Sequence, residues 1–228
     1  MKKETFIISL GGSLIVPNGG INTSFLKDFN HFIREKVKKG QRFFIICGGG
    51  ATARGYQTAA REIGNLARED VDWIGIHATR LNAHLLRTIF RDIAHSKVIE
   101  NPYKIEIASE PVIVAAGWKP GWSTDYIATI LAKEYAVKVL LNLSDIDTVY
   151  DKDPNKFPNA LSLSKINWVD FRKIVGDKWN PGLNVPFDPV AAKMANEEGL
   201  TVVIIKGTNF ENLEKFFAGK KFVGTVIK

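Results

Sequence analysis

The chain has 228 residues, 45% of them hydrophobic, and carries a formal net charge of +7 from 31 Lys and Arg against 24 Asp and Glu. This composition predicts one folded domain over residues 1–228 and argues against global disorder. A single cysteine excludes an internal disulfide, and no apolar run approaches membrane-spanning length. We therefore expect a cytoplasmic protein with no membrane partner. Its positive charge favours small anionic ligands, and because that charge is dispersed we expect no nucleic-acid partner.

Strand and helix patterns alternate along the chain. Short apolar runs predict strands, and apolar residues at helical spacing predict helices. The expected strands are Thr5 to Leu10, Arg42 to Cys47, Pro111 to Ala115, Lys138 to Leu143, Thr201 to Ile205 and Phe222 to Ile227. The expected helices are Phe25 to Val37, Ala51 to Ile63, Glu69 to Ala94, Tyr126 to Tyr135, Trp168 to Val175, Asp188 to Glu198, and a short last helix with capping-box spacing between Thr208 and Glu211. Residues 151–160 and 176–187 are predicted to be irregular.

This alternation predicts an α/β fold, a three-layer α/β/α sandwich with a mainly parallel central sheet. Ligands of such sheets bind beyond the carboxyl ends of the strands. Four strands are followed by unusual loops, so we expect these loops to meet at one sheet edge. The loops contain Gly11-Gly12-Ser13, Gly48-Gly49-Gly50, residues 116–125, and Asp145 with Asp147. Two glycine clusters suggest two phosphate-bearing ligands, because glycine lets backbone N–H groups approach a phosphate closely.

The loop after residue 115 leads into a helix that opens with Ser123, Thr124 and Asp125. Free N–H groups at such a junction can hold an anion, although Ser123 or Thr124 can equally serve only as a helix cap. Trp118 and Trp122 flank the loop, and stacking on a base, a packed lid and a subunit contact all remain open for them.

Other nucleotide and metal motifs are absent from the sequence. Neither the Walker pattern nor G-x-G-x-x-G occurs, which argues against a P-loop enzyme and a dinucleotide binder. The four histidines have no metal-ligand spacing with cysteines or carboxylates, so no protein metal site is predicted. They are His31, His77, His84 and His95.

Six segments with glycine, hydroxyl, acidic or basic residues follow one another along the chain. They are Leu10 to Ser13, Gly48 to Gly50 with Arg54, Asp72 to Arg80, Ser123 to Asp125, Asp145 to Tyr150 with Asp153-Pro154, and Asp188 to Lys193. Over nearly the whole chain, this order resembles the amino-acid kinase superfamily, most of all its uridylate (UMP) kinase branch of archaeal type. The resemblance implies an amino-acid kinase-like fold, a homo-oligomer (a hexamer), and transfer of the γ-phosphoryl group of ATP to UMP with Mg²⁺ as cofactor, a step of pyrimidine nucleotide biosynthesis.

The resemblance also implies roles for single residues, with the acceptor site in the N-terminal half and the ATP site in the C-terminal half. Arg54 is expected on the UMP phosphate and Asp72 on the ribose. The implied UMP contacts are Gly49, Gly50, Arg54, Asp72, Gly117, Ser123, Thr124 and Asp125. The implied ATP contacts are Gly11, Gly12, Ser13, Asp145, Asp147, Tyr150, Asp153 and Asp188. The implied catalytic residues are Gly12, Ser13, Asp145 and Lys193.

Each charged position also has a structural interpretation. Arg54 and Lys193 can be solvated helix charges, and Asp72 can be a carboxylate near a helix start. Asp147 and Asp153 can be turn residues.

Three positions depart from the superfamily pattern. Ser9 stands where many members have a lysine, Thr148 replaces a usual glycine, and the 117–122 loop is unusually aromatic, with Lys119 as a substitute cation. Two other functions therefore remain open. One is a sibling kinase with a different phosphate or carboxylate acceptor. The other is a non-catalytic nucleotide-binding or storage protein, for which Ser9 is the main argument.

Overall fold

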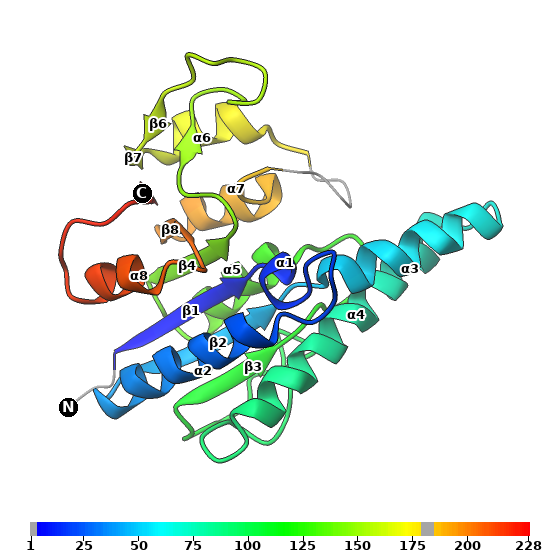
Figure 1. The fold of residues 1–228 in the computed structure, drawn as a ribbon, viewed down its shortest axis with the longest axis horizontal. Coiled ribbons are helices and arrows are strands. Elements are labelled where there is room, and N and C mark those ends of the chain that lie inside the picture. The colour runs from blue at the N-terminus through cyan, green and yellow to red at the C-terminus, as the bar shows by residue number, and fades with distance from the viewer. Residues whose placement is uncertain (1–3, 179–184) are drawn as a thin grey trace.

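The computed structural model describes residues 4–178 and 185–228. Its central sheet has seven strands in the order β3-β2-β1-β4-β8-β9-β7 (Figure 1). The first five of these strands run parallel, and only the pairing of β9 with β8 is antiparallel. The strands are β1 (Thr5–Leu10), β2 (Arg42–Cys47), β3 (Val112–Ala115), β4 (Val139–Ser144), β7 (Lys165–Ile166), β8 (Thr201–Lys206) and β9 (Thr225–Ile227), beside a small antiparallel pair of β5 (Val149–Tyr150) and β6 (Ser162–Leu163).

Helices cover both faces of the sheet and build two separate cores. One core packs side chains of α2, α4 and α8 against one face, and the other packs α5, α6 and α7 against the opposite face. The α/β/α prediction is therefore confirmed. The helices are α1 (Gly12–Ile15), α2 (Thr23–Lys38), α3 (Gly50–Ile63), α4 (Arg68–Ile89), α5 (Thr124–Glu134), α6 (Trp168–Val175), α7 (Pro189–Glu197) and α8 (Phe210–Phe217).

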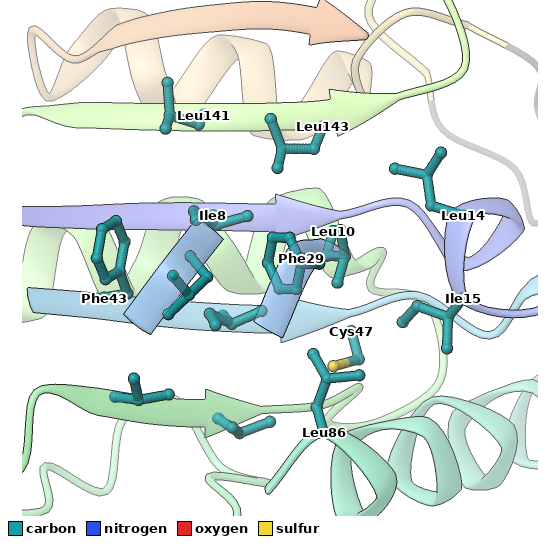
Figure 2. Packing of buried hydrophobic residues seen from close by; sticks show 14 of the residues in the cluster. Ile8, Leu10, Leu14, Ile15, Phe29, Phe43, Cys47, Leu86, Leu141 and Leu143 are labelled. Carbon is teal, nitrogen blue, oxygen red and sulfur yellow. The ribbon is translucent and has the colours of Figure 1, made fainter. Parts of the chain in front are cut away.

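Side-chain alternation explains how one strand serves both cores. In β1, Ile8 and Leu10 point to the first core while Ile7 points to the second. Figure 2 shows Phe29 of α2 beside Leu10 of β1 in the first core, which also contains Ile8 and Phe43. Strands buried on both faces consist almost entirely of apolar residues, as expected for a parallel sheet covered by helices.

Several element boundaries differ from the sequence prediction. Helix α4 ends at Ile89 instead of Ala94, because Ala94 turns back to form a bridge with Val112. The capping-box prediction at Thr208 is wrong: Asn209 is the cap of α8, and its side chain accepts from the Asn212 N–H.

Two further differences lie near the strand ends. The last strand is shorter than predicted and begins at Thr225. The short helix α1, directly after Gly11, was not predicted. Of the irregular stretch predicted over 176–187, residues 179–184 lie outside the described residues.

The long helices α3 and α4 pack side by side and project beyond the sheet (Figure 1). In the part of the chain that the structure describes, no helix combines the length and apolar character needed to cross a membrane.

Candidate functional site

The glycine loops after β1 and β2 lie against each other at the carboxyl edge of the sheet. The Gly48 N–H donates to the Leu10 carbonyl at 2.9 Å, and the Gly11 N–H donates to the Leu143 carbonyl at 2.8 Å. These bonds continue the pairing of β1 with β2 on one side and with β4 on the other. Since β3 is the next neighbour of β2, the structure brings all four predicted loops to the same edge.

The contact between the two glycine loops leaves no room for side chains. A Cβ atom on Gly12 would lie 2.1 Å from the Gly50 nitrogen, and one on Gly48 would lie 2.4 Å from the Gly12 nitrogen. Gly50 also has a φ of +62°, which is strained for other residues. The backbones of the first and second loops are therefore in direct contact.

The side chain of Asn82 in α4 binds the backbone of the second glycine loop, a contact that was not predicted from the sequence. Its buried side-chain amide donates to the carbonyls of Gly48 at 2.8 Å and Gly49 at 3.3 Å. An asparagine on the buried side of a predicted helix was the available signal, because such an amide needs a specific partner.

Arg54 lies exposed one turn into α3, immediately beyond the second glycine loop. Its guanidinium is 3.4 Å from the Asn18 side-chain oxygen. Arg54 and Asn18 line an open cavity of about 460 Å³ with Ala51 and Thr58. The predicted phosphate contact is thus beside the glycine loop and faces open space.

The loop of residues 117–122, here called the acceptor loop after the role that the sequence resemblance implies for it, is attached to α4 near both of its ends. The Gly117 N–H donates to the Thr79 hydroxyl oxygen at 2.8 Å, and the Gly121 N–H donates to the Asp72 carboxylate at 3.2 Å. Thr79 in turn donates to the Ile76 carbonyl at 2.6 Å. Two of the predicted UMP contacts, Asp72 and Gly117, therefore both take part in the attachment of this loop to α4, two helical turns apart.

The aromatic residues of the acceptor loop pack against neighbouring rings. Trp122 stacks on Tyr126 with ring centroids 4.3 Å apart, and Trp118 meets Tyr103 edge-on at 5.3 Å. The Lys119 ammonium lies 4.1 Å from the Trp118 ring centroid. Of the roles left open for the two tryptophans, a packed loop fits these contacts best.

Asp125, in the first turn of α5, joins three elements of the sheet edge. One carboxylate oxygen accepts from the Ser9 hydroxyl at 2.7 Å and from the Asn142 side-chain amide at 2.9 Å. The other oxygen accepts from the Asp188 N–H at 3.2 Å. Asp125 was predicted as a UMP contact, and the structure places it between the glycine loops and the start of α7.

Burial raises the pKa values of two neighbouring carboxyl groups in this region. The pKa of Asp125 rises to about 6, mainly through desolvation and further through the charge of Asp188, while its hydrogen bonds from Ser9, Asp188 and Asn142 oppose the shift. Desolvation also raises the pKa of Asp188, against hydrogen bonds from Ser123 and from backbone N–H groups of α7. Asp188 caps α7, as predicted, by accepting from the Val190 and Ala191 N–H groups.

Ser123 and Thr124 open α5, next to Asp125. Ser123 is the cap of the helix, and its hydroxyl oxygen accepts from the Tyr126 N–H at 3.1 Å. The capping interpretation of Ser123 is therefore confirmed, and a ligand contact from the same residue stays a prediction.

The predicted donor-side residues follow β4 and β5. Asp145 is exposed directly after β4, and Asp147 forms a 3.3 Å ion pair with Lys206. Tyr150 ends β5, Asp153 accepts from the Asn155 N–H in the following turn, and Lys193 is exposed on the second turn of α7. Within residues 4–178 and 185–228, no three His, Cys, Asp or Glu side chains are grouped to hold a metal ion.

Comparison with known protein families matches residues 4–206 to the amino acid kinase family. A uridylate kinase from Methanocorpusculum labreanum is 34% identical over 226 residues, which cover 97% of this chain and 94% of that protein. A uridylate kinase from Sulfurisphaera tokodaii is 33% identical over 200 residues, covering 86% and 88%.

Two solved structures are similar over the whole chain. The uridylate kinase of Archaeoglobus fulgidus has a TM-score of 0.83 at 34% identity, covering 98% of this chain and 99% of that one. The UMP kinase of Ureaplasma parvum has a TM-score of 0.80 at 22% identity, and this second likeness supports the fold alone.

Proposed function

This chain belongs to the amino acid kinase family, and from that membership we propose that it is a UMP kinase, which transfers the γ-phosphoryl group of ATP to UMP and yields ADP and UDP. The observation that carries the proposal is the backbone contact between Gly12 and Gly50. This contact supports the proposal, because a glycine loop that can hold a donor phosphate lies against one that can hold an acceptor phosphate. Phosphoryl transfer depends mostly on such positioning and on neutralising spread negative charge.

On the acceptor side, the loop of Gly49 and Gly50 offers backbone N–H groups, and Arg54 offers a planar guanidinium that suits two phosphate oxygens. The carboxylate of Asp72 accepts hydrogen bonds from the ribose hydroxyls beside the one that it accepts from the Gly121 N–H. Gly117 and the start of α5 at Ser123, Thr124 and Asp125 close the acceptor site on the opposite side.

On the donor side, Gly11, Gly12 and Ser13 contact the β- and γ-phosphates of ATP. Asp147, Tyr150 and Asp153 lie along the nucleoside, and Asp188 at the start of α7 faces the phosphates. Asp145 is an exposed carboxylate at this edge, and Lys193 is an exposed cation on α7.

Mg²⁺ fits the residues proposed on the ATP side. The ion prefers oxygen ligands such as carboxylates, and the Asp145 carboxylate is open to solvent. Bound there with ATP, the ion would neutralise phosphate charge during transfer. The expected check is loss of turnover with a magnesium chelator and its return when Mg²⁺ is added in excess.

We also place the protein in the cytoplasm as a homo-oligomer, a hexamer by resemblance. Helix α3 and the turn after it expose Tyr56, Ile63 and Leu66, with 87% of Ile63 accessible, which is consistent with a subunit contact there. Light scattering on the purified protein would measure the oligomeric state directly.

A nucleotide-binding or storage protein without turnover is the second candidate, and Ser9 favours it. Ser9, the residue before the last one of β1, has a neutral hydroxyl that is hydrogen-bonded to Asp125. It therefore brings no ammonium group to the point of phosphoryl transfer. One assay separates the candidates: ADP release with ATP, Mg²⁺ and a panel of nucleoside monophosphates extended by other phosphate and carboxylate acceptors. Turnover selective for UMP supports the kinase, nucleotide binding without turnover supports the second candidate, and turnover of another phosphate or carboxylate acceptor identifies a sibling kinase.

A further inference from the structure

Arg80 of α4 holds the first part of the acceptor loop through its backbone carbonyls. Its guanidinium donates to the Gly117 carbonyl from Nε at 3.4 Å and to the Trp118 carbonyl from Nη2 at 3.1 Å. Its remaining terminal nitrogen, Nη1, lies 3.1 Å from the Glu100 carboxylate. One side chain thus joins α4, the acceptor loop and the segment that precedes β3.

The surroundings of Arg80 favour one fixed orientation of its guanidinium. The side chain is 20% exposed, and its guanidinium carbon lies 5.8 Å from the ring centroid of Trp73, two turns earlier on α4. A guanidinium offers five N–H donors in a rigid planar fork, whereas a lysine ammonium is a compact point donor. Only arginine can reach two adjacent carbonyls and a carboxylate at once in this geometry.

The contacts of Arg80 complete a set that fixes the acceptor loop along α4. Thr79 holds the Gly117 N–H and Asp72 holds the Gly121 N–H, while Arg80 holds the carbonyls between them. Without Arg80, the hydrogen bonds that the loop would retain to the described residues lie near its two ends. The position of Gly121 at the Asp72 carboxylate would then be poorly defined.

We propose that Arg80 is a positioning residue of the acceptor site: by fixing the backbone at Gly117 and Trp118, it sets how closely the acceptor loop approaches Asp72 and therefore how tightly the acceptor nucleoside binds. This inference rests on the proposed function, because it assigns the loop to the acceptor. In this role Arg80 contacts no reacting atom and acts only by positioning the loop.

The chain contains a matched control in Arg42. Its guanidinium also donates to two backbone carbonyls, those of Ala108 and Glu110, and lies 5.3 Å from the centroid of the Phe44 ring. Arg42 begins β2 and is therefore at the end of the sheet opposite the glycine loops. A general effect of weakening an arginine clamp should appear equally in Arg42→Lys and Arg80→Lys.

The first test is kinetic. We expect Arg80→Lys to raise KM for UMP about tenfold, the size of one lost charge-assisted hydrogen bond, with KM for ATP and kcat within about twofold of wild type. Arg42→Lys should leave both KM values unchanged. An equal rise of both KM values in Arg80→Lys, or no rise for UMP, would overturn the inference.

The second test does not depend on turnover. In the protein without nucleotides, we expect backbone amides of the acceptor loop to exchange hydrogen about tenfold faster in Arg80→Lys than in wild type or Arg42→Lys. Equal exchange in all three proteins would overturn the inference. If wild type fails to phosphorylate UMP, the proposed kinase function fails, and this exchange measurement still decides whether Arg80 positions the loop.

A third variant covers the case in which Arg80→Lys does not fold. Glu100 is 45% exposed, so Glu100→Gln removes one partner of Arg80 without a buried defect. It should speed exchange of the same amides, by about two- to threefold, since a partly exposed ion pair contributes little. Exchange unchanged from wild type would count against the inference.

Discussion

The Ser9 hydroxyl donates a 2.7 Å hydrogen bond to the Asp125 carboxylate across 116 positions of sequence. The other hydrogen-bond donors to this carboxylate among the described residues are the Asn142 amide and the Asp188 N–H, both neutral. Ser9 is itself buried, and Asp125 has another carboxyl group, that of Asp188, nearby. Burial of this carboxylate and the like charge beside it favour its protonated form, and the three neutral hydrogen bonds only partly oppose this.

This environment predicts a pH dependence of stability that Asp125 causes. The pKa of Asp125 is about 6 in the folded protein against an ordinary value of 3.8. Because the folded state holds this proton more tightly than the unfolded chain, the free energy of unfolding falls as pH rises from about 4 to about 6 and then stays lower. The fall is on the order of 3 kcal/mol.

Asp125→Asn should remove this contribution, and thermal unfolding at pH 4 and pH 7 measures it. We expect the variant to gain stability relative to wild type on going from pH 4 to pH 7. The exposed Asp28→Asn is the control, with no such relative gain. A difference between Asp125→Asn and wild type that is the same at both pH values would contradict the assignment.

Gly12→Ala should disrupt the glycine contact. The added Cβ would meet backbone atoms of Gly50 and Gly48 at 2.1 and 2.6 Å, and backbone cannot rotate away as a side chain can. We expect a loss of about 3 kcal/mol or more in the free energy of unfolding, at or beyond the upper end of overpacking effects. Gly19→Ala, which meets open space, should have little effect, and similar losses in both variants would argue against the close approach.

Arg54→Ala should weaken binding of the acceptor and spare the donor. Removing a guanidinium that holds a phosphate through charged hydrogen bonds should raise KM for UMP by about tenfold to a hundredfold, with KM for ATP nearly unchanged. Steady-state kinetics with each substrate varied in turn measures the two values. Arg61→Ala, two turns further along α3, is the control. Equal effects of Arg54→Ala on both substrates would remove Arg54 from the acceptor site.

Asn82→Ala should destabilise the second glycine loop. The truncation leaves the carbonyls of Gly48 and Gly49 without their side-chain donor at a buried position, a defect that costs about 1–3 kcal/mol. Urea unfolding would detect a lower midpoint with an unchanged slope. The exposed Asn65→Ala should unfold like wild type, and an Asn82→Ala midpoint equal to both would show that the two bonds contribute nothing.

Residues close in sequence carried most of what was predicted correctly. The apolar runs at Thr5 to Leu10 and Arg42 to Cys47 became adjacent parallel strands, and the glycines after them met at the sheet edge. The turn of Asp188 into α7 followed the cap and proline pattern. Local patterns succeed here because periodicity and capping are properties of a few neighbouring residues.

Individual side-chain contacts between distant segments were not predicted. The sequence suggested a ligand contact for Asp125 but gave no sign of its bond to Ser9, and Arg80 appeared only inside a motif without a role. Helix α4 was overextended because the pattern of its apolar face continues past Ile89, whereas Ala94 is drawn into a bridge with Val112.

The sequence by itself determined the kind of molecule: the order of strands and helices, the covered parallel sheet, and the glycine and acidic loops that such a sheet collects at one edge. Only the tertiary structure decided which groups meet there, including the pairing of Asp125 with a neutral Ser9 and the hold of Arg80 on the acceptor loop. The physical reason is that hydrophobic periodicity is local and tolerant of substitution, whereas a hydrogen bond requires two distant atoms to arrive within about 3 Å at a favourable angle.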